Sequence, residues 1–185
     1  MPIYYARHGQ TDWNCANKMM AQGDIPLNET GRAEALELAM RACALGIERI
    51  LSSDLCRCTE TAQIVGKRLG VATIETSPLL REVDMGQWVG ATPQQVLQPE
   101  DGTDVLAHLC RVDPARAAPG GESPLAFLAR VKEALAWIRQ EVDPKQQVLV
   151  VTHGGVLRAL HGGCTIESLS VSFNAGNCQI VTTDQ

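Results

Sequence analysis

Short hydrophobic runs alternate along this chain with longer stretches in which apolar residues recur at helical spacing. The runs at residues 3–6, 47–51, 71–74 and 148–152 have the length and the β-branched or aromatic content typical of strands. Such an alternation indicates a parallel sheet with helices packed on its faces. We therefore predict an α/β fold, a three-layer α/β/α sandwich with a mostly parallel central sheet. The very hydrophobic strand at 148–152 should lie at its centre, buried on both faces.

The length and composition agree with one folded unit. The chain has 185 residues, 45% of them hydrophobic, which is typical of one globular domain and excludes a wholly disordered protein. We expect a single domain over residues 1–185. Residues 77–121 are richer in Pro, Gly, Gln and Asp and are expected to form an excursion over the sheet, with short helices around 93–97 and 105–110.

Start and stop signals predict a helix between the first two strands. It is expected to begin after Asn28, which suits an N-cap, and to end at Gly46, which suits a left-handed C-terminal position. Helical spacing predicts that its buried stripe consists of Leu36, Ala39, Met40 and Cys43.

Further helices are expected on the same grounds. One over about 56–69 ends at Gly70, and another begins with Ser123 as N-cap and Pro124 in its first turn. The apolar face of the latter is predicted to consist of Leu128, Val131, Leu135 and Ile138. The remaining expected elements are a helix at 154–160 and an edge strand at 178–182.

Charge and hydrophobic patterning exclude several classes of protein. Sixteen Lys and Arg against 21 Asp and Glu give a net charge of −5 without any basic stripe, so we expect no nucleic-acid partner. No run approaches the ~18 apolar residues of a membrane span, and the first residues do not resemble a secretory signal. The expected location is therefore the cytoplasm, with no membrane partner. The seven scattered cysteines are expected to be reduced and mostly buried, because Cys56-Arg57-Cys58 has the wrong spacing for a zinc or redox motif.

Two histidines occupy matching positions. Arg7-His8-Gly9 follows the first predicted strand, and His153-Gly154-Gly155 follows the central one. A single His-Gly after a strand is usually only a turn. Because ligands of parallel sheets bind at the carboxyl ends of the strands, two such histidines are expected to face each other across one pocket. The glycine after each histidine is expected to let a ligand approach the backbone.

Arginines cluster in the same parts of the sequence and suggest an anionic ligand. Arg7 precedes the first histidine, and Arg57 lies in the first turn of a predicted helix near Ser53, where guanidinium and backbone N–H groups together suit a phosphate. The alternative for Arg57 is an exposed helix charge. We assign Arg158 to structural pairing.

Five motifs, in the same order as in a known family, extend this pattern over most of the chain. They are Arg7-His8-Gly9-Gln10-Thr11 with Asn14, Ser52-Ser53-Asp54-Leu55 with Arg57 and Thr61-Ala62, Leu80-Arg81-Glu82 with Gly86, Trp88 and Gly90, Gly120-Gly121-Glu122-Ser123, and Val151-Thr152-His153-Gly154-Gly155. Together they resemble the histidine phosphatase (phosphoglycerate mutase-like) superfamily. The resemblance implies a phosphoglycerate mutase-like fold in which the 77–121 excursion covers the active site.

The resemblance also implies a mechanism without a cofactor or metal. His8 would attack phosphorus to form a phosphohistidine that water then hydrolyses. Arg7, Arg57 and His153 would hold the phosphate oxygens, and Glu82 would serve as the general acid and base. His8 must be neutral to attack, and neighbouring guanidinium groups disfavour its protonated form.

Other residues have weaker or competing assignments. Asp84 competes with Glu82 for the role of acid, and Arg81 could pair with either carboxylate. The residues expected to contact substrate or phosphate are Asn14, Gln22, Gly23 and Gly154. Ser123 is explained by capping a helix, with Glu122 beside it. His108 and His161 are expected to be surface or packing residues, and a metal site built from His8, Glu82, His153 and His161 is not favoured because no ligand spacing supports it.

The resulting hypothesis is a metal-independent phosphomonoesterase that acts on a small phosphorylated metabolite as a monomer or homodimer. Only 37 residues separate Glu82 from Gly120, whereas the mutases that the chain resembles carry larger insertions over the site. The alternatives are a phosphoglycerate mutase, a phosphohistidine phosphatase and a non-catalytic phospholigand-binding protein. Two departures from the family pattern bear on the pocket and the sheet edge: the link from Gln22-Gly23 to Asp24-Ile25-Pro26-Leu27 is about two residues short, and the segment after Arg158 lacks part of a helix.

Overall fold

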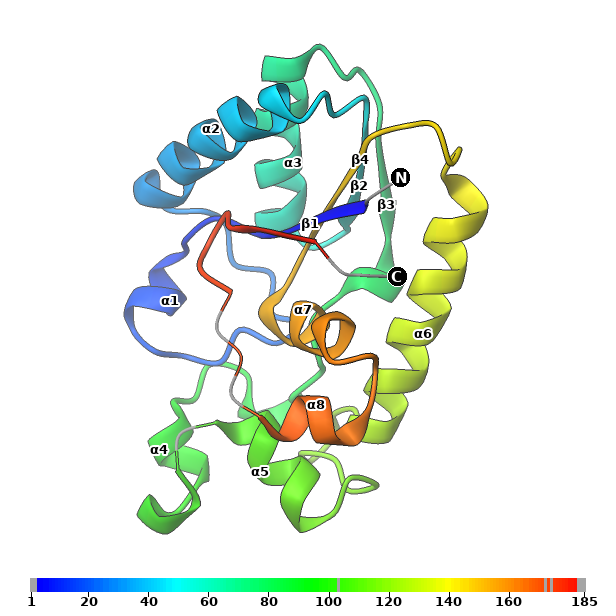
Figure 1. Ribbon diagram of the computed structural model, residues 1–185. Coiled ribbons are helices and arrows are strands. Elements are labelled where there is room, and N and C mark those ends of the chain that lie inside the picture. The colour runs from blue at the N-terminus through cyan, green and yellow to red at the C-terminus, as the bar shows by residue number, and fades with distance from the viewer. Residues whose placement is uncertain (1–2, 103, 172, 174, 183–185) are drawn as a thin grey trace.

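The computed structural model describes residues 3–102, 104–171, 173 and 175–182. Five strands in this part of the chain form one sheet, and helices cover both of its faces (Figure 1). The elements are β1 (Ile3–Arg7), α1 (Asp12–Cys15), α2 (Glu29–Ala44), β2 (Arg49–Ser53), α3 (Cys56–Leu69), β3 (Ile74–Ser77), η1 (Pro78–Leu80), η2 (Gly86–Trp88), α4 (Pro93–Val96), η3 (Pro99–Asp101), α5 (Val105–Val112), α6 (Pro124–Glu141), β4 (Val148–Thr152), α7 (Gly154–His161), α8 (Ile166–Ser170) and β5 (Ile180–Thr182).

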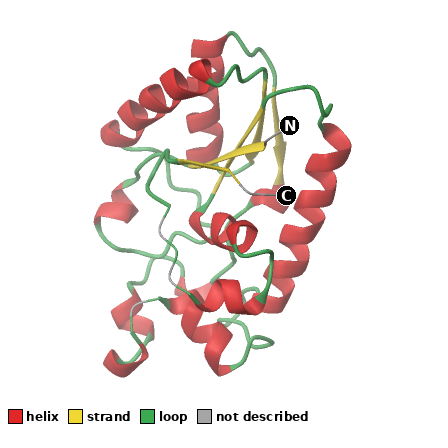
Figure 2. Cartoon of the chain, viewed as in Figure 1, coloured by secondary structure: helices red, strands yellow, loops and turns green. Residues whose placement is uncertain are grey.

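The sheet is mostly parallel, as predicted. Its strand order is β3-β2-β4-β1-β5, so β4 lies at the centre between β2 and β1. The registers pair Tyr5 of β1 and Leu51 of β2 with Val150 of β4, all in parallel, whereas β5 runs antiparallel at the edge. Figure 2 shows the strands enclosed by helices on either side. The α/β sandwich predicted from the alternation of strands and helices is therefore confirmed.

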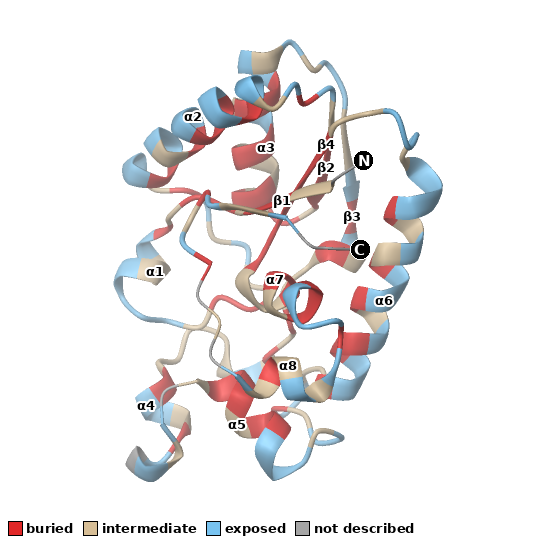
Figure 3. Cartoon of the chain, in the orientation of Figure 1, coloured by how far each residue is buried: buried red, intermediate tan, exposed pale blue. Residues whose placement is uncertain are grey.

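Two hydrophobic cores lie on the two faces of the sheet, and β4 contributes to both. Val148 and Val150 pack with the residues of α6 and α7, whereas Leu149 and Val151 pack with those of α2 and α3. Every residue of β4 is fully buried, as Figure 3 shows along the central strand. This burial on both faces explains why β4 is the most hydrophobic strand.

The predicted helix termini are largely correct. The Asn28 side chain accepts a hydrogen bond from the Gly31 N–H, and the Ser123 hydroxyl accepts one from the Ala126 N–H. Gly70 ends α3 in the left-handed conformation with φ +74°. These signals are local, because each depends on hydrogen bonds or dihedral angles within one turn.

The predicted buried stripe of α2 is correct for Ala39 and wrong for its other three residues. Leu36 and Met40 are 53% and 61% exposed, and Cys43 is exposed as well. The buried positions share the same helical spacing but are mostly small: Gly31, Ala35, Leu38, Ala39 and Ala42. Small side chains let α2 lie close to α3 and the sheet, and the larger apolar residues are left on the outer face.

Three strands begin later than predicted, and one of them is the edge strand β5, which covers Ile180–Thr182 instead of 178–182. β2 covers Arg49–Ser53 instead of 47–51, and β3 covers Ile74–Ser77 instead of 71–74. The hydrogen bond from the Val71 N–H to the Gly66 carbonyl holds residue 71 at the end of α3, and the parallel register pairs Ile50 with Ile74. The shift places Ser53 at the carboxyl end of β2.

The excursion at 77–121 contains η1, η2, α4, η3 and α5, and Figure 1 shows α4 and α5 beyond the end of the sheet where β4 ends and α7 begins. The two predicted short helices are present as α4 and α5. All seven cysteines are free, and four of them are buried. Among the described helices, none is both long and apolar enough to span a bilayer.

Candidate active site

His8 directly follows β1 and is held by its backbone and its ring. Its N–H donates to the Thr152 carbonyl at 3.0 Å, which continues the pairing of β1 with β4. Ring atom Nδ1 lies 2.8 Å from the Gly9 carbonyl oxygen. Because a carbonyl only accepts, Nδ1 carries the proton, and the neutral ring has its lone pair on Nε2.

The surroundings of His8 favour this neutral form. Its side chain is 2% exposed, and burial is the main cause that lowers its pKa well below the ordinary value. The charges of Arg7 and Arg57 lower it further. The ring is therefore neutral, and its unprotonated Nε2 can act as a nucleophile near two cations.

Arg57 is fully buried, so its interpretation as an exposed helix charge is wrong. It lies in the first turn of α3, where Nη1 donates to the Gly23 carbonyl and Nη2 to the Ala21 carbonyl, each at 2.7 Å. Nη2 also lies 3.2 Å from Nδ1 of His153. These contacts fix the guanidinium group against the loop that precedes α2.

Arg7 complements Arg57 at the end of β1. Its Nη1 donates to the Ala175 carbonyl at 3.2 Å. Burial lowers the pKa of Arg7, and the charge of Arg57 also lowers it, whereas Glu82 raises it. The buried Nε atoms of Arg7 and Arg57 have no hydrogen-bond partner among the described residues. Two cations that line the same cavity favour an anionic ligand there.

His153 lies next to His8 but is enclosed by protein. The two ring centroids are 5.3 Å apart with the planes at 60°. Since the Arg57 guanidinium only donates, Nδ1 of His153 accepts, and Nε2 donates to the Ser53 hydroxyl at 2.9 Å. Burial, followed by the charge of Arg57, lowers the pKa of His153 well below its usual value. His153 is fully buried and does not line the cavity described below, unlike His8.

Glu82 brings a carboxylate to the same place. Oε2 accepts from the N–H of Gly155 in the first turn of α7 at 3.0 Å, and Oε1 accepts from the N–H of Val83 at 2.9 Å. Asp84 instead accepts from the Gly86 N–H within its own turn, and Arg81 pairs with Asp54. The structure thus favours Glu82 over Asp84 as the candidate acid.

A cavity of about 500 Å³ connects these groups to the surface. Arg7, His8, Arg57 and Glu82 line it, and its exposed rim includes Lys18. Four of its lining side chains are cationic and two are carboxylates, although the whole chain carries a net charge of −5. The local excess of positive charge suits a phosphorylated ligand. The cationic and acidic lining residues are Arg7, Lys18, Arg57 and Arg158 with Glu82 and Asp104.

The residues expected to contact substrate divide into two groups. Asn14 lines the cavity, with its side-chain oxygen on the Thr11 N–H. Gln22, Gly23 and Gly154 do not line it. Gln22 donates to the Glu82 carbonyl at 3.2 Å, and the Gly23 carbonyl accepts from Arg57. These two residues therefore contact residues of the site and not the cavity.

The structure gives a different explanation for the glycines after the two histidines from the ligand approach that was expected. A Cβ on Gly9 would overlap the Gly31 carbonyl of α2, so protein rather than ligand fills this space. A Cβ on Gly154 would meet Arg7 Nε at an ordinary 3.7 Å. At Gly155 it would overlap Glu82 Oε1. Gly155, which also lines the cavity, is the glycine that the site requires.

Sequence reasoning missed Gly155 and Arg130. Gly155 had a signal, because the second glycine of the motif lies in the first turn of a helix, where free N–H groups bind carboxylates. Arg130 in α6 contacts the backbone on either side of Glu82. Its signal was its spacing, because Arg130 lies three residues after buried Phe127 and four before buried Ala134, on the inner face of α6.

The remaining predicted residues lie outside this cluster or serve the fold. His161 stacks on Phe173, and His108 lies 3.4 Å from Asp101. Arg158 pairs with Asp104, as expected, although both also line the cavity. In the described part of the chain, no three His, Cys, Asp or Glu side chains gather as metal ligands do.

The comparisons with known proteins agree with this geometry. The profile of the histidine phosphatase superfamily (branch 1) matches residues 3–184, and the chain belongs to this family. The probable phosphoglycerate mutase GpmB of Cronobacter sakazakii is 34% identical over 169 residues, which cover 91% of this chain and 74% of that protein.

Solved structures show the same likeness. A mycobacterial glucosyl-3-phosphoglycerate phosphatase in complex with VO3 is 30% identical, with a TM-score of 0.80 over 97% of this chain and 88% of that chain. The protein TTHB049 of Thermus thermophilus is also 30% identical, with a TM-score of 0.74 over 100% of this chain and 94% of that chain. The phosphoglycerate mutase-like fold is therefore established, and the family supports an enzyme that transfers phosphoryl groups.

Proposed function

We propose that this protein is a metal-independent phosphomonoesterase that hydrolyses a small phosphorylated metabolite through a phosphohistidine. The observation that carries the proposal is the state of His8: Nδ1–H is fixed on the Gly9 carbonyl, Nε2 holds the lone pair, and Arg7 and Arg57 line the same cavity. A neutral nucleophile that shares a cavity with two cations is suited to a phosphate dianion.

The first step transfers the phosphoryl group to the enzyme. The His8 Nε2 lone pair forms a bond to phosphorus while the bond from phosphorus to the ester oxygen breaks. Arg7 and Arg57 stabilise the charge on the remaining phosphate oxygens, and His153 supports this cluster by holding Arg57. Glu82, on the cavity wall, donates its proton to the leaving oxygen, so the alcohol departs neutral.

The second step releases phosphate. A water molecule attacks the phosphorus of phosphohistidine, and the ionised Glu82 takes one of its protons. The bond between phosphorus and Nε2 breaks, which returns the lone pair to His8. Orthophosphate leaves, and both residues regain their starting protonation states.

Hydrolysis is favoured over the mutase alternative by the short excursion. A mutase must retain its phosphorylated product and shield the phosphohistidine from water. Here the segment between Glu82 and Gly120 has 37 residues, and exposed Asn17 and Lys18 belong to the cavity lining. The likeness to a probable phosphoglycerate mutase keeps the mutase as the second candidate, and 3-phosphoglycerate is its diagnostic substrate.

The decisive experiment measures orthophosphate release from para-nitrophenyl phosphate and a panel of small phosphomonoesters in excess EDTA. We expect turnover by the unmodified protein and an acid-labile phosphoenzyme that is absent from His8→Ala. The panel includes 3-phosphoglycerate, a phosphohistidine peptide and sugar phosphates, which separates the substrate classes.

Each other outcome contradicts the proposal in a different way. Loss of activity in EDTA that metal restores would exclude the metal-independent mechanism. Isomerised phosphoglycerate without orthophosphate would identify a mutase. Binding of vanadate without turnover of any ester would indicate a phospholigand-binding protein.

A further inference from the structure

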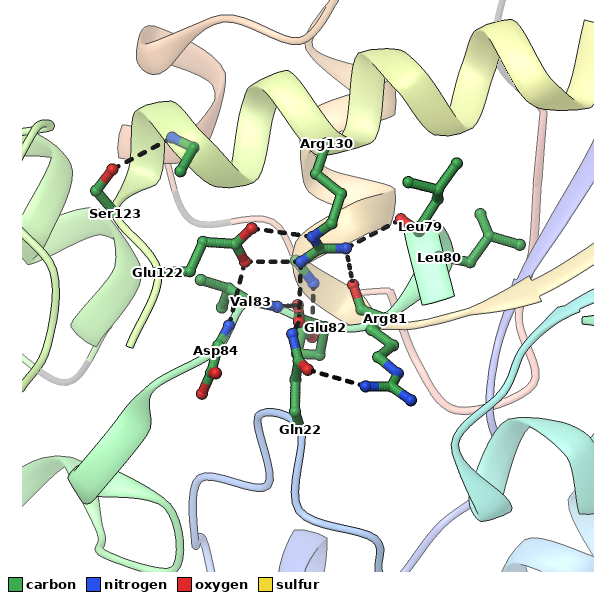
Figure 4. Close-up of polar contacts among 12 residues, drawn as sticks. Gln22, Leu79, Leu80, Arg81, Glu82, Val83, Asp84, Glu122, Ser123 and Arg130 are labelled. Carbon is green, nitrogen blue, oxygen red and sulfur yellow. Dashed lines mark hydrogen bonds and ion pairs between the residues drawn. The ribbon is translucent and has the colours of Figure 1, made fainter. Parts of the chain in front are cut away.

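The backbone that carries Glu82 lies between η1 and η2, outside any regular element. Residues 82–85 belong to neither helix nor strand. The backbone of this segment must therefore be fixed by groups that pack against it. Figure 4 shows that Arg130 of α6 extends into it.

Arg130 uses its full set of donors on this segment and its partner. Nη1 donates to the carbonyls of Leu79 at 2.9 Å and Arg81 at 2.8 Å, and Nη2 donates to the Glu82 carbonyl at 3.1 Å. Nε and Nη2 donate to the two carboxylate oxygens of Glu122 at 2.9 and 2.7 Å. A guanidinium group has five N–H donors, and all five are engaged.

Glu122 extends the grip to the other side of Glu82. Its Oε2 accepts from the Asp84 N–H at 3.3 Å, and the Asp84 carbonyl accepts from the Glu122 N–H at 2.8 Å. Arg130 holds the chain up to residue 82, and Glu122 holds it at residue 84. The Glu82 backbone is thus fixed on both sides by one partly buried ion pair, with the two side chains 17% and 15% exposed.

We propose that the Arg130–Glu122 pair positions Glu82 for proton transfer to the leaving oxygen. This inference rests on the proposed function, because it requires Glu82 to be the general acid of the proposed reaction. Arg130 is not itself a cavity-lining residue, so it acts only through Glu82. A misplacement of about 1 Å in such a group costs on the order of 10²-fold in rate.

The test compares two esters that differ in their need for an acid. A simple alkyl phosphate requires protonation of its leaving oxygen, whereas 2,4-dinitrophenyl phosphate releases a stable anion without it. For Arg130→Lys we expect kcat/KM to fall on the order of 10- to 100-fold with the alkyl ester and only about 2-fold with the aryl ester. Lysine keeps the charge but places its donors on one nitrogen, so it cannot reproduce the planar fork.

Three further variants complete the design. Glu82→Gln shows how the two rates change when the acid is lost. The double variant Arg130→Lys, Glu82→Gln should be no slower on the alkyl ester than Glu82→Gln alone, because both substitutions remove the same function, proton donation by Glu82. Glu122→Gln should give the same pattern more weakly. Arg49→Lys is the matched control, since Arg49 is 20% exposed and pairs with Glu75 at the opposite end of the sheet.

The ratio of the two kcat/KM values does not depend on the fraction of folded enzyme, so a destabilised variant still reports on the proposal. Equal loss with both esters in Arg130→Lys and Glu122→Gln would show a purely structural role and overturn it. A change of the ratio in Arg49→Lys would overturn it as well. Failure of the proposed function is distinguishable, because the unmodified protein would then hydrolyse neither ester, or Glu82→Gln would itself show no dependence on the leaving group.

Discussion

Two His-Gly sequences follow two adjacent parallel strands, yet their imidazole rings have different surroundings. His8 after β1 lines the cavity, whereas His153 after β4 is enclosed. The ring of His8 has one nitrogen on the Gly9 carbonyl, and the ring of His153 lies between Arg57 and Ser53. Similar local sequence gives similar backbone placement, but the partners of each ring determine what it can do.

The difference arises from the elements that meet each histidine. Arg57 at the start of α3 and Ser53 at the end of β2 converge on His153 because β2 pairs with β4. His8 follows β1, which lies on the other side of β4 and pairs with β4 and with the antiparallel edge strand β5. Position in the strand order therefore separates a candidate nucleophile from a residue that holds an arginine.

Substitution of the two histidines tests this comparison with the largest expected effect. His8→Ala should lower kcat/KM for para-nitrophenyl phosphate on the order of 10³-fold or more, because the nucleophile is lost. His153→Ala should cost on the order of 10²-fold or less, because Arg57 keeps its bonds to the Gly23 and Ala21 carbonyls. Phosphoenzyme trapping after an alkaline denaturing quench, which preserves phosphohistidine, should succeed with His153→Ala but not with His8→Ala. A phosphoenzyme in His8→Ala would reverse the assignment.

Alanine substitutions at the two glycines after His153 test the position of Glu82, because each adds a single Cβ atom. Gly155→Ala should lower kcat/KM on the order of 10- to 100-fold, because its Cβ would displace the Glu82 carboxylate. Gly154→Ala should stay within about 3-fold of the unmodified protein, since its Cβ meets only Arg7 at 3.7 Å. Steady-state kinetics on one ester measures both. Equal effects of the two variants would show that Glu82 is not held as described.

Stability against pH tests what the two histidines share. Their pKa values are lowered in the folded state and return to about 6.5 on unfolding. Below that pH the unfolded state binds more protons, so the free energy of unfolding falls as the pH falls. Each histidine contributes a slope of at most about 1.4 kcal/mol per pH unit.

The expected result is a lower unfolding midpoint near pH 5 than near pH 7 in thermal scans. His8→Gln and His153→Gln should each flatten this dependence, although only the first removes the candidate nucleophile. An unchanged slope in either variant would mean that its histidine is protonated or solvated in the folded protein. The two histidines would then differ in burial as well as in their effect on catalysis.

Features that depend on local chemistry were predictable. The N-caps Asn28 and Ser123 and the left-handed Gly70 act within one turn of the chain. The buried β4 was evident from its hydrophobicity, because a strand covered on both faces is apolar at nearly every position. The site was predictable in outline, since parallel strands place the residues that follow them at one edge of the sheet.

Features that depend on which elements approach each other were not predictable. Periodicity gives the spacing of a buried stripe, but only the contact of α2 with α3 and the sheet selects the small residues Ala35 and Ala42 over Leu36 and Met40. The parallel pairing of β2 with β3 likewise begins later in both strands than the hydrophobic runs predicted.

The sequence by itself determined the layered α/β fold, the helix termini and the placement of His8, Arg57 and His153 near one sheet edge, because hydrophobic periodicity and capping are local. Only the tertiary structure decided that His153 is enclosed, that Gly155 rather than Gly154 meets Glu82, and that Arg130 grips the backbone beside this carboxylate. These results depend on side chains from distant parts of the chain that converge within a few ångströms, and no local pattern encodes such distances.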